Sequence, residues 1–204
     1  MFPDLMRDDV FRLETKRLWL RWPRAADAVA IAKLAGEAEV AEMTANIPHP
    51  YPPGAAAEFV LQSRMGNLAG TSVVLMLSPR ARPAETMGCI SLQARDRGQA
   101  ELGYWLGRPY WGQGLMTEAA RTMFEVIFQI TDLNVVTASA RPGNGRSIGV
   151  LEACGFQRMS SGLLTAPARG TQVPVDHFRL TRAHIGRKSG SRERPLAAMQ
   201  MQTA

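Results

Sequence analysis

A glycine-rich turn placed directly before a helix is the feature that most constrains this chain. The turn reads Tyr110-Trp-Gly-Gln-Gly114, follows a strand-like run over 100–106 and precedes a helix predicted over 117–130. Glycine lets a backbone pass close to a ligand. The free amides of a first helical turn, reinforced by the helix dipole, then face a bound anion. The turn therefore predicts a loop that binds phosphate groups.

The elements on either side of this turn predict a mixed α/β chain. Strands are expected at 17–21, 71–77, 86–92, 100–106, 133–139 and 173–180, from alternating or β-branched apolar runs. Helices are expected at 25–35, 55–67, 117–130 and 147–153, and the last ends at Gly155. Four prolines between 46 and 54 exclude regular structure there. The expected order is β-α-α-β-β-β-α-β-α-β-β in a single domain, with one of the last two strands given no range of its own.

The composition indicates where the protein is located and whether disulfide or metal sites are expected. No apolar run approaches the length that crosses a bilayer, and the first residues lack a signal-peptide pattern, so we expect a cytoplasmic protein. Cys89 and Cys154 stand in apolar surroundings, which favours buried thiols over a disulfide. The three histidines lack metal-ligand spacing, so no metal site is predicted. A basic tail, predicted to be disordered, occupies 186–204 after a domain over 11–185.

Four motifs occur in a fixed order along the chain. They are Leu13-Glu-Thr-x-Arg-Leu18, Ala100-Glu-Leu-Gly-Tyr-Trp-Leu106, Tyr110-Trp-Gly-Gln-Gly114 with Thr117-Glu-Ala119, and Asn144-x-x-Ser147 followed by Val150-Leu-Glu-x-x-Gly-Phe156. Together they resemble the GCN5-related N-acetyltransferases (the GNAT superfamily). They are most similar to its RimJ/RimL-like group, which acetylates the N-termini of ribosomal proteins. The resemblance runs from about residue 11 to residue 185.

The resemblance implies the GNAT fold, a single twisted mixed sheet flanked by helices. Its central parallel strands, here 100–106 and 133–139, splay apart, and the pantetheine arm of acetyl-CoA fills the gap. The diphosphate of acetyl-CoA is expected on the amides of 111–117. The residues that the resemblance assigns to this donor are Tyr104, Trp105, Leu106, Trp111, Gly112, Gln113, Gly114, Leu115, Met116, Thr117, Asn144 and Ser147.

The phosphate loop departs from the family pattern at two positions. Trp111 stands where arginine or glutamine is usual, and Met116 stands where glycine or alanine is usual. Met116 is expected to narrow the loop beside the phosphates. Because the contacts to the phosphates come mainly from backbone amides, we expect binding to survive both changes.

Acetyl transfer needs a neutral amine, so a base must remove a proton from the acceptor ammonium. Glu101, on the strand beside the gap, is the candidate base, directly or through a water. The alternative is a strand carboxylate that faces solvent or pairs with an arginine. The resemblance makes Ser147 the candidate hydrogen-bond donor to the departing sulfur, with Tyr104 as a rival. The alternative for Ser147 is a helix N-cap, a role that serine often fills.

The acceptor is the part that the sequence describes least. The resemblance implies acceptor walls at 41–57 and in the loop 160–173 before the last strand, and Glu37, Glu39 and Glu42 place negative charge close by. The favoured acceptor is the α-amine of a protein or peptide N-terminus, and the alternative is a small amine such as an amino sugar or an antibiotic. A non-catalytic acyl-CoA-binding or ribosome-associated module, with RNA contact through the basic tail, also stays open. The chain is expected to be a monomer or a homodimer.

Overall fold

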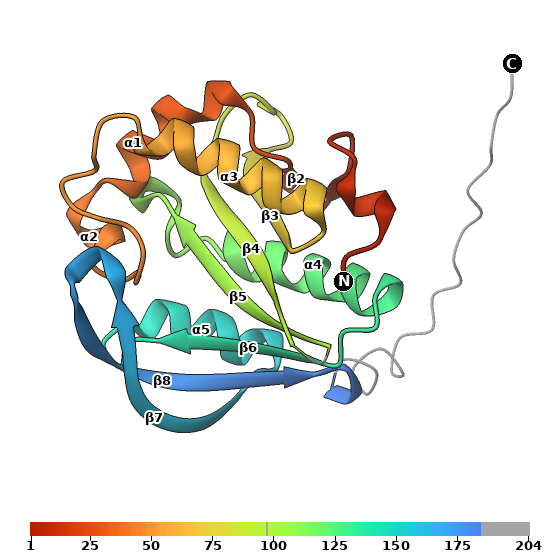
Figure 1. The fold of residues 1–204 in the computed structure, drawn as a ribbon, viewed down its shortest axis with the longest axis vertical. Coiled ribbons are helices and arrows are strands. Elements are labelled where there is room, and N and C mark those ends of the chain that lie inside the picture. The colour runs from red at the N-terminus through yellow and green to blue at the C-terminus, as the bar shows by residue number, and fades with distance from the viewer. Residues whose placement is uncertain (97, 185–204) are drawn as a thin grey trace, which may run out of the picture.

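The computed structural model describes residues 1–96 and 98–184. Its strands are β1 (Arg12–Glu14), β2 (Leu18–Arg21), β3 (Ser72–Pro79), β4 (Gly88–Arg95), β5 (Gln99–Leu106), β6 (Val135–Ala140), β7 (Gln157–Ala166) and β8 (Thr171–Thr181). Within these residues they form one eight-stranded sheet with the order β1-β2-β3-β4-β5-β6-β8-β7 (Figure 1). Neighbouring strands are antiparallel except β5 and β6, which are parallel. This is the mixed α/β architecture that the sequence predicted.

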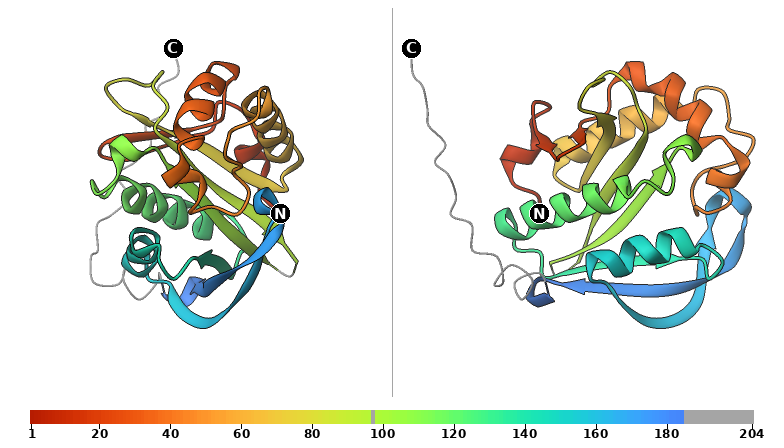
Figure 2. Two further views of the ribbon diagram at one scale, coloured as in Figure 1. Left: turned by 90° about the vertical axis from the view of Figure 1, so that its left-hand side faces the viewer. Right: turned by 180° about the vertical axis from the view of Figure 1, so that it is seen from behind.

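Helices cover both faces of the sheet. They are α1 (Ala28–Ala35), α2 (Ala38–Ala41), α3 (Ala55–Ala69), α4 (Leu115–Ile130) and α5 (Gly145–Cys154), with short 3-10 turns at Asp4–Arg7, Ala25–Asp27, Arg108–Tyr110 and Pro167–Arg169. Helices α1 and α3 lie on one face and α4 and α5 on the other, as the view from behind shows (Figure 2). In the described part of the chain, every helix is too short or too polar to cross a membrane.

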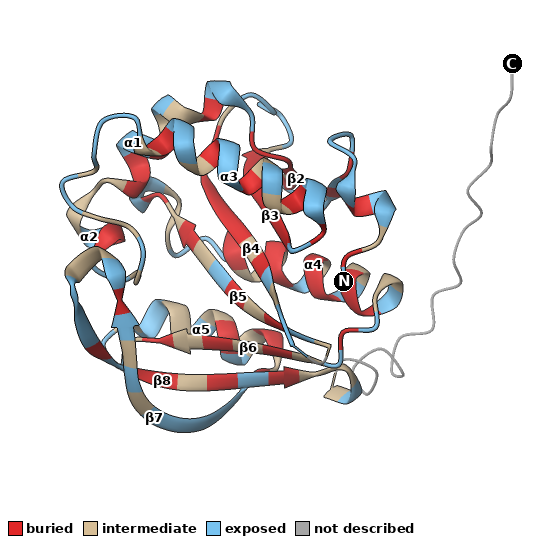
Figure 3. Ribbon diagram, in the orientation of Figure 1, coloured by how far each residue is buried: buried red, intermediate tan, exposed pale blue. Residues whose placement is uncertain are grey.

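The central strands are buried because both faces of the sheet are covered. In β3, Val73, Leu75 and Leu77 pack in the core that includes α4, whereas Val74 and Met76 pack in the core that includes α1 and α3. A strand buried on both faces reads as a continuous apolar run, which is the pattern of 72–77. The buried colour of β3 and β4 in Figure 3 follows this arrangement. Phe2 and Met6 belong to the α4 core, so the packed unit includes residues before residue 11.

The parallel pair β5 and β6 is joined only where the two strands begin. Gln99 pairs with Val135, Ala100 with Val136, and Glu101 with Thr137, and the register between these described strands then stops. Beyond that point β5 stays paired with β4 up to Leu106, while β6 stays paired with β8 up to Ala140. The sheet therefore opens into two halves after Glu101 (Figure 1). This opening confirms the predicted splay.

Most predicted elements occur with ends shifted by up to three residues, but some expectations were wrong. Helix α4 begins at Leu115, two residues before the expected start, and the helix expected at 25–35 begins as a 3-10 turn. Strand β1 and helix α2 were not predicted. The segment 160–173, expected as a loop, is mostly strand, because β7 and β8 form a long antiparallel pair through it.

Candidate active site

The opening between β5 and β6 contains a cavity of about 1050 Å³. Its lining comes mainly from β5, β6, the first turns of α4 and α5, the segment from α2 to α3, and the β7–β8 hairpin. The structure brings nearly all of the predicted site residues to this one cavity: Glu101, Tyr104, Trp105, Leu106, Trp111, Gly112, Gly114, Leu115, Met116, Thr117, Asn144 and Ser147. Gln113 is not among the lining residues. Its side-chain amide instead donates to the carbonyl of Pro109 at 3.0 Å.

The first turn of α4 faces this cavity with its amides. Gly112 and Gly114 have φ angles of +73° and +69°, a left-handed conformation that other residues rarely adopt. Gly114 is the N-cap, and the first helical hydrogen bond runs from the Glu118 amide to its carbonyl at 3.1 Å. The amides of 115–117 therefore have no partner within the helix. Together with the helix dipole they make this end of the cavity suited to an anion.

A network from the N-terminal motif fixes this turn. The Thr15 hydroxyl donates to the Glu118 carboxylate at 2.6 Å, and the Arg17 guanidinium pairs with the same carboxylate at 2.6 Å. Arg17 also donates to the carbonyl of Gln113 at 2.9 Å. Burial on its own raises the pKa of Glu118, but the hydrogen bonds from Thr15 and Arg17 outweigh it and leave the pKa below its usual range. Two of the sequence motifs thus meet at the start of α4.

A hydrogen-bonded pair of hydroxyl groups bridges β5 and α5. The Tyr104 hydroxyl lies 2.8 Å from Oγ of Ser147, and the Ser147 amide donates to the side-chain oxygen of Asn144 at 3.1 Å. Asn144 is therefore the N-cap of α5, and the alternative reading of Ser147 as the cap is wrong. Ser147 lines the cavity, and its hydroxyl contacts that of Tyr104.

The hydroxyl of Tyr104 is held in its neutral form. Burial raises its pKa to about 12, although the hydrogen bond with Ser147 acts in the opposite direction. The thiol of Cys89 also lines the cavity, and burial, with a smaller effect of the Asp27 charge, raises its pKa to about 12 as well. Both groups are therefore protonated near neutral pH, which makes Tyr104 a hydrogen-bond donor and Cys89 a poor nucleophile.

Glu101 lies at the last register pair before the strands separate, and it lines the cavity. Its carboxylate is also ion-paired with Arg95 of the neighbouring strand β4 at 2.5 Å. The side chain of Glu101 is 37% exposed, so solvent reaches it. Glu101 thus has the position expected of a base, and it also has the arginine partner that the alternative interpretation expected. The role of Glu101 as a base stays a prediction.

The two departures in the phosphate loop have different structural outcomes. The indole Nε1 of Trp111 donates to the carbonyl of Leu106 at 2.6 Å, which ties the loop to the end of β5. Met116 is 5% exposed and belongs to the core beneath α4, so the bulk of its side chain lies in the interior. A residue that the sequence reading did not single out, Arg146 of α5, places its guanidinium 4.8 Å from the centre of the Trp111 ring.

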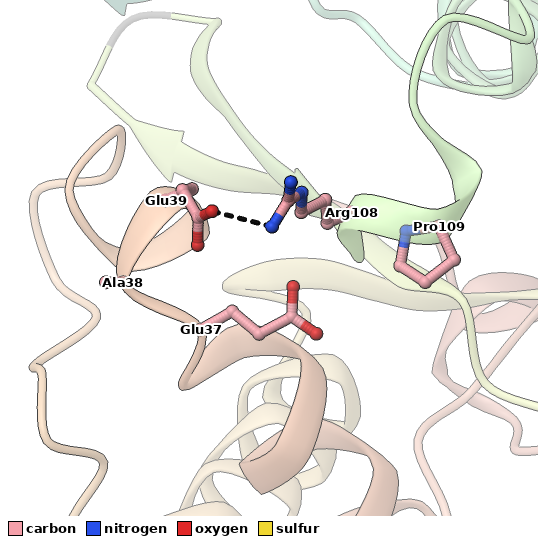
Figure 4. A pocket seen from close by; sticks show the side chains of 5 residues that line it. All are labelled: Glu37, Ala38, Glu39, Arg108 and Pro109. Carbon is pink, nitrogen blue, oxygen red and sulfur yellow. Dashed lines mark hydrogen bonds and ion pairs between the residues drawn. The ribbon is translucent and has the colours of Figure 1, made fainter.

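The acidic residues on the acceptor side differ in whether an arginine already pairs with them and in which hollow they line. Glu39 pairs with Arg108 at 2.7 Å beside a second, shallower hollow of about 580 Å³, toward which Glu37 also extends (Figure 4). Glu42 and Glu58 line the main cavity instead. Arg108 and Glu58 were missed because a single charged residue next to a turn or on a helix carries no sequence signal.

The tip of the β7–β8 hairpin closes one side of the cavity. The Arg169 guanidinium donates to the carbonyls of Ala41 and Thr44, and the amide of Ala168 donates to the carbonyl of Ala45 at 3.3 Å. The end of α2 and the loop after it therefore lie against a hairpin that is far away in the sequence (Figure 1). Among residues 1–96 and 98–184 no group of three or more acidic, histidine or cysteine side chains is arranged to hold a metal ion.

Comparisons with known proteins agree with this geometry. Residues 17–157 match the model of the acetyltransferase (GNAT) domain family, which is more than half of the chain. The chain therefore belongs to the GNAT acetyltransferase family. An uncharacterized N-acetyltransferase, p20 of Bacillus licheniformis, is 36% identical over 88 residues, which are 42% of this chain and 48% of that protein. The chain thus spans about half the length of this curated relative.

Solved structures share the fold at lower sequence identity. RimL, a ribosomal L7/L12 α-N-protein acetyltransferase in complex with coenzyme A, aligns with a TM-score of 0.72 at 16% identity, over 84% of this chain and 98% of that chain. Spermidine N-acetyltransferase from Vibrio cholerae, in complex with coenzyme A and spermine, aligns with a TM-score of 0.68 at 15% identity, over 82% and 97% of the two chains. At these identities the likeness shows the fold alone.

Proposed function

We propose that this protein is an acetyl-CoA-dependent N-acetyltransferase whose acceptor is the α-amine of a protein or peptide N-terminus. The observation that carries the proposal is the opening between β5 and β6, with its cavity extending to the uncapped amides of α4. A slot between two strands suits an extended chain with amide groups, and the helix start suits phosphates.

The residues present fit coenzyme A. Beyond Glu101 the edge of β5 that faces the opening has no strand partner among the described residues, so its backbone groups are free to pair with the amides of a pantetheine arm. A Cβ added at Gly112 meets no atom within 4 Å, so the backbone of the loop is open on that side. Because Trp111 already donates to the Leu106 carbonyl, we expect the arm contacts mainly at Tyr104 and Trp105.

When bound, acetyl-CoA supplies an acetyl group activated as a thioester. We propose that Glu101 accepts the proton of the acceptor ammonium, whose pKa is about 8 for an α-amine and about 10 for a lysine. Glu101 thereby delivers a neutral amine to the cavity. The Tyr104–Ser147 pair joins β5 to α5 across the opening and presents a hydroxyl group that donates to a departing sulfur. Attack of the neutral amine would form the bond from nitrogen to the acetyl carbon as the carbon–sulfur bond breaks, and this pair would hydrogen-bond the thiolate that leaves.

The acceptor assignment rests on the pKa of the amine and on the acceptor described for a protein with the same fold. An α-amine needs a weaker base than a lysine does, which suits a solvent-reached carboxylate such as Glu101. A structural neighbour is described as an α-N-protein acetyltransferase. The alternative is a small polyamine, because Glu42, Glu58 and Glu101 line one cavity and another neighbour is a spermidine acetyltransferase. Contact with RNA through 186–204 concerns residues outside the described structure and stays a prediction.

A thiol-release assay tests the proposal. Purified protein and acetyl-CoA are mixed with peptides that begin with alanine or serine, with the same peptides blocked at the N-terminus, and with spermidine and an aminoglycoside. Release of coenzyme A with free but not blocked peptides supports the α-amine acceptor. Release with spermidine or the aminoglycoside alone moves the assignment to small amines. Failure of the protein to bind coenzyme A at all would remove the donor and the whole proposal.

A further inference from the structure

The cavity is lined by seven charged residues, three of which are cations. The set is Glu39, Glu42, Glu58, Glu101, Arg108, Arg141 and Arg146. Arg108 is ion-paired with Glu39, and Arg141 donates to the carbonyl of Glu42 at 2.8 Å. The side chain of Arg146 has neither an ion pair nor a hydrogen bond among the described residues, and its guanidinium lies over the ring of Trp111. All of its side-chain donors are therefore available to a ligand, whereas Arg108 and Arg141 each use a donor within the chain.

The position of Arg146 is unfavourable for folding by itself. It is the second residue of α5, and the first turn of that helix carries no acidic residue. A cation there opposes the helix dipole, whose positive end is at the N-terminus. Residues in locally unfavourable positions, such as a cation at a helix N-terminus, are expected at functional sites. An anion bound in the cavity would compensate for this unfavourable charge.

Stacking on Trp111 orients the guanidinium without using its donors. A guanidinium placed over an aromatic face at 4.8 Å keeps its five N–H groups in its own plane. The Trp111 ring is itself fixed, because its Nε1 donates to the Leu106 carbonyl. The cation is thus held in place before a ligand arrives, at the loop that precedes α4.

We propose that Arg146, stacked on Trp111, binds the diphosphate of the coenzyme A donor and supplies from α5 the positive charge that the phosphate loop lacks at position 111. The inference rests on the proposed function. It adds to that function a donor-binding residue in α5, on the β6 side of the opening. Trp111 stands where the family pattern has arginine or glutamine. In this chain Trp111 provides the ring on which the guanidinium stacks, and Arg146 on the other side of the opening provides the charge. Donor binding therefore bridges β5 and β6 at the mouth of the cavity.

The test compares coenzyme A binding by isothermal titration calorimetry in the full-length protein and three variants. Arg146→Gln removes the charge, and Arg146→Lys keeps the charge but loses the planar fork. The matched control is Arg12→Gln, because Arg12 also stacks on a tryptophan, with its guanidinium 5.0 Å from the Trp19 ring, but lies outside the cavity. Each protein is titrated with coenzyme A and with dephospho-coenzyme A, which keeps the diphosphate but lacks the 3′-phosphate, at low and high salt.

We expect Arg146→Gln to weaken binding of both ligands by on the order of tenfold or more, the usual worth of a hydrogen bond to a charged group. Arg146→Lys should lose less, Arg12→Gln should bind like the wild type, and the binding of Arg146→Gln should depend less on salt. Equal affinities of the wild type and Arg146→Gln would overturn the assignment and leave the proposed function intact. A loss confined to coenzyme A would overturn the diphosphate in favour of the 3′-phosphate. Failure of the wild type to bind either ligand would overturn the proposed function and this assignment together.

Discussion

The Thr15 hydroxyl donates to the Glu118 carboxylate at 2.6 Å, across 103 residues of sequence. Arg17 completes the contact by pairing with Glu118 and by holding the carbonyl of Gln113. The N-terminal strand motif and the acidic residue in the first turn of α4 are therefore parts of one structure. That structure fixes the loop on which the donor phosphates are proposed to bind.

The Glu118 network predicts a pH-dependent contribution to stability. The pKa of Glu118 is lowered in the folded state, so its contribution is present above the ordinary carboxyl range and is lost as the pH falls through the folded-state pKa. Glu118→Gln should therefore reduce the free energy of unfolding at neutral pH, and its difference from the wild type should shrink below about pH 4. Urea denaturation at several pH values measures this. Glu125→Gln, an exposed change on the same helix, is the control, and an equal effect of both variants contradicts the prediction.

A pair of variants separates the two interpretations of Glu101. If Glu101 is the base, Glu101→Gln lowers kcat by on the order of a hundredfold, a common contribution of a general base, and leaves the Kd of coenzyme A nearly unchanged. Arg95→Gln removes the same ion pair but keeps the carboxylate, so it should retain most of the activity. Steady-state kinetics and calorimetry give both quantities. Similar small effects of the two variants would show that Glu101 serves only as the partner of Arg95.

The hydroxyl pair predicts a division of roles between Tyr104 and Ser147. If Ser147 donates to the departing sulfur, Ser147→Ala lowers kcat by on the order of tenfold or more, and Tyr104→Phe lowers it less because it only orients Ser147. The reverse order of effects would assign the donor to Tyr104. Because burial raises the pKa of Tyr104 to about 12, loss of its proton should not limit kcat below about pH 10, the usual tyrosine range. A pH profile of kcat for the wild type and both variants measures this.

The left-handed glycine at the start of α4 predicts a local cost of substitution. Gly114→Ala places an L side chain at φ +69°, so it should destabilise the fold by about 1–2 kcal/mol and weaken donor binding. Gly149→Ala is the control for stability without ligand, since a Cβ there meets nothing within 4 Å and Gly149 lies inside helix α5, although it also lines the cavity. It should stabilise the protein by about 0.5–1 kcal/mol. Thermal unfolding with and without coenzyme A compares them, and equal stability of the two variants contradicts the expected strain.

The sequence predicted those elements that have a strong periodic or turn signal. Helix α4 has a continuous apolar face from Ala119 to Ile130, and β3 is a buried apolar run, so both were found with small errors at the ends. Strand β7 has no such pattern, because it lies at the edge of the sheet and most of its residues are exposed. A polar edge strand is defined by its pairing with β8, and pairing cannot be derived from local propensity.

At the candidate site, too, the sequence predicted local features but not the contacts between residues on different elements. The phosphate loop was predicted because glycines before a helix have a local physical meaning. The stacking of Arg146 on Trp111 and the pairing of Arg95 with Glu101 join residues on different elements. The N-cap role of Asn144 depends on where α5 begins, and the sequence placed that start two residues too late. Contacts of this kind follow from the fold, so they became visible only with it.

The arginine at the tip of the β7–β8 hairpin predicts an effect on the acceptor alone. Arg169 holds the carbonyls of Ala41 and Thr44, and the segment that it holds lines the cavity away from the start of α4. Arg169→Gln should therefore raise the KM for the acceptor found by thiol release by several-fold, the effect of losing hydrogen bonds from a charged group, while the Kd of coenzyme A stays unchanged. Arg179→Gln, an exposed change on β8, is the control. An unchanged acceptor KM, or an equal loss of donor affinity, would show that the hairpin tip does not position the acceptor wall.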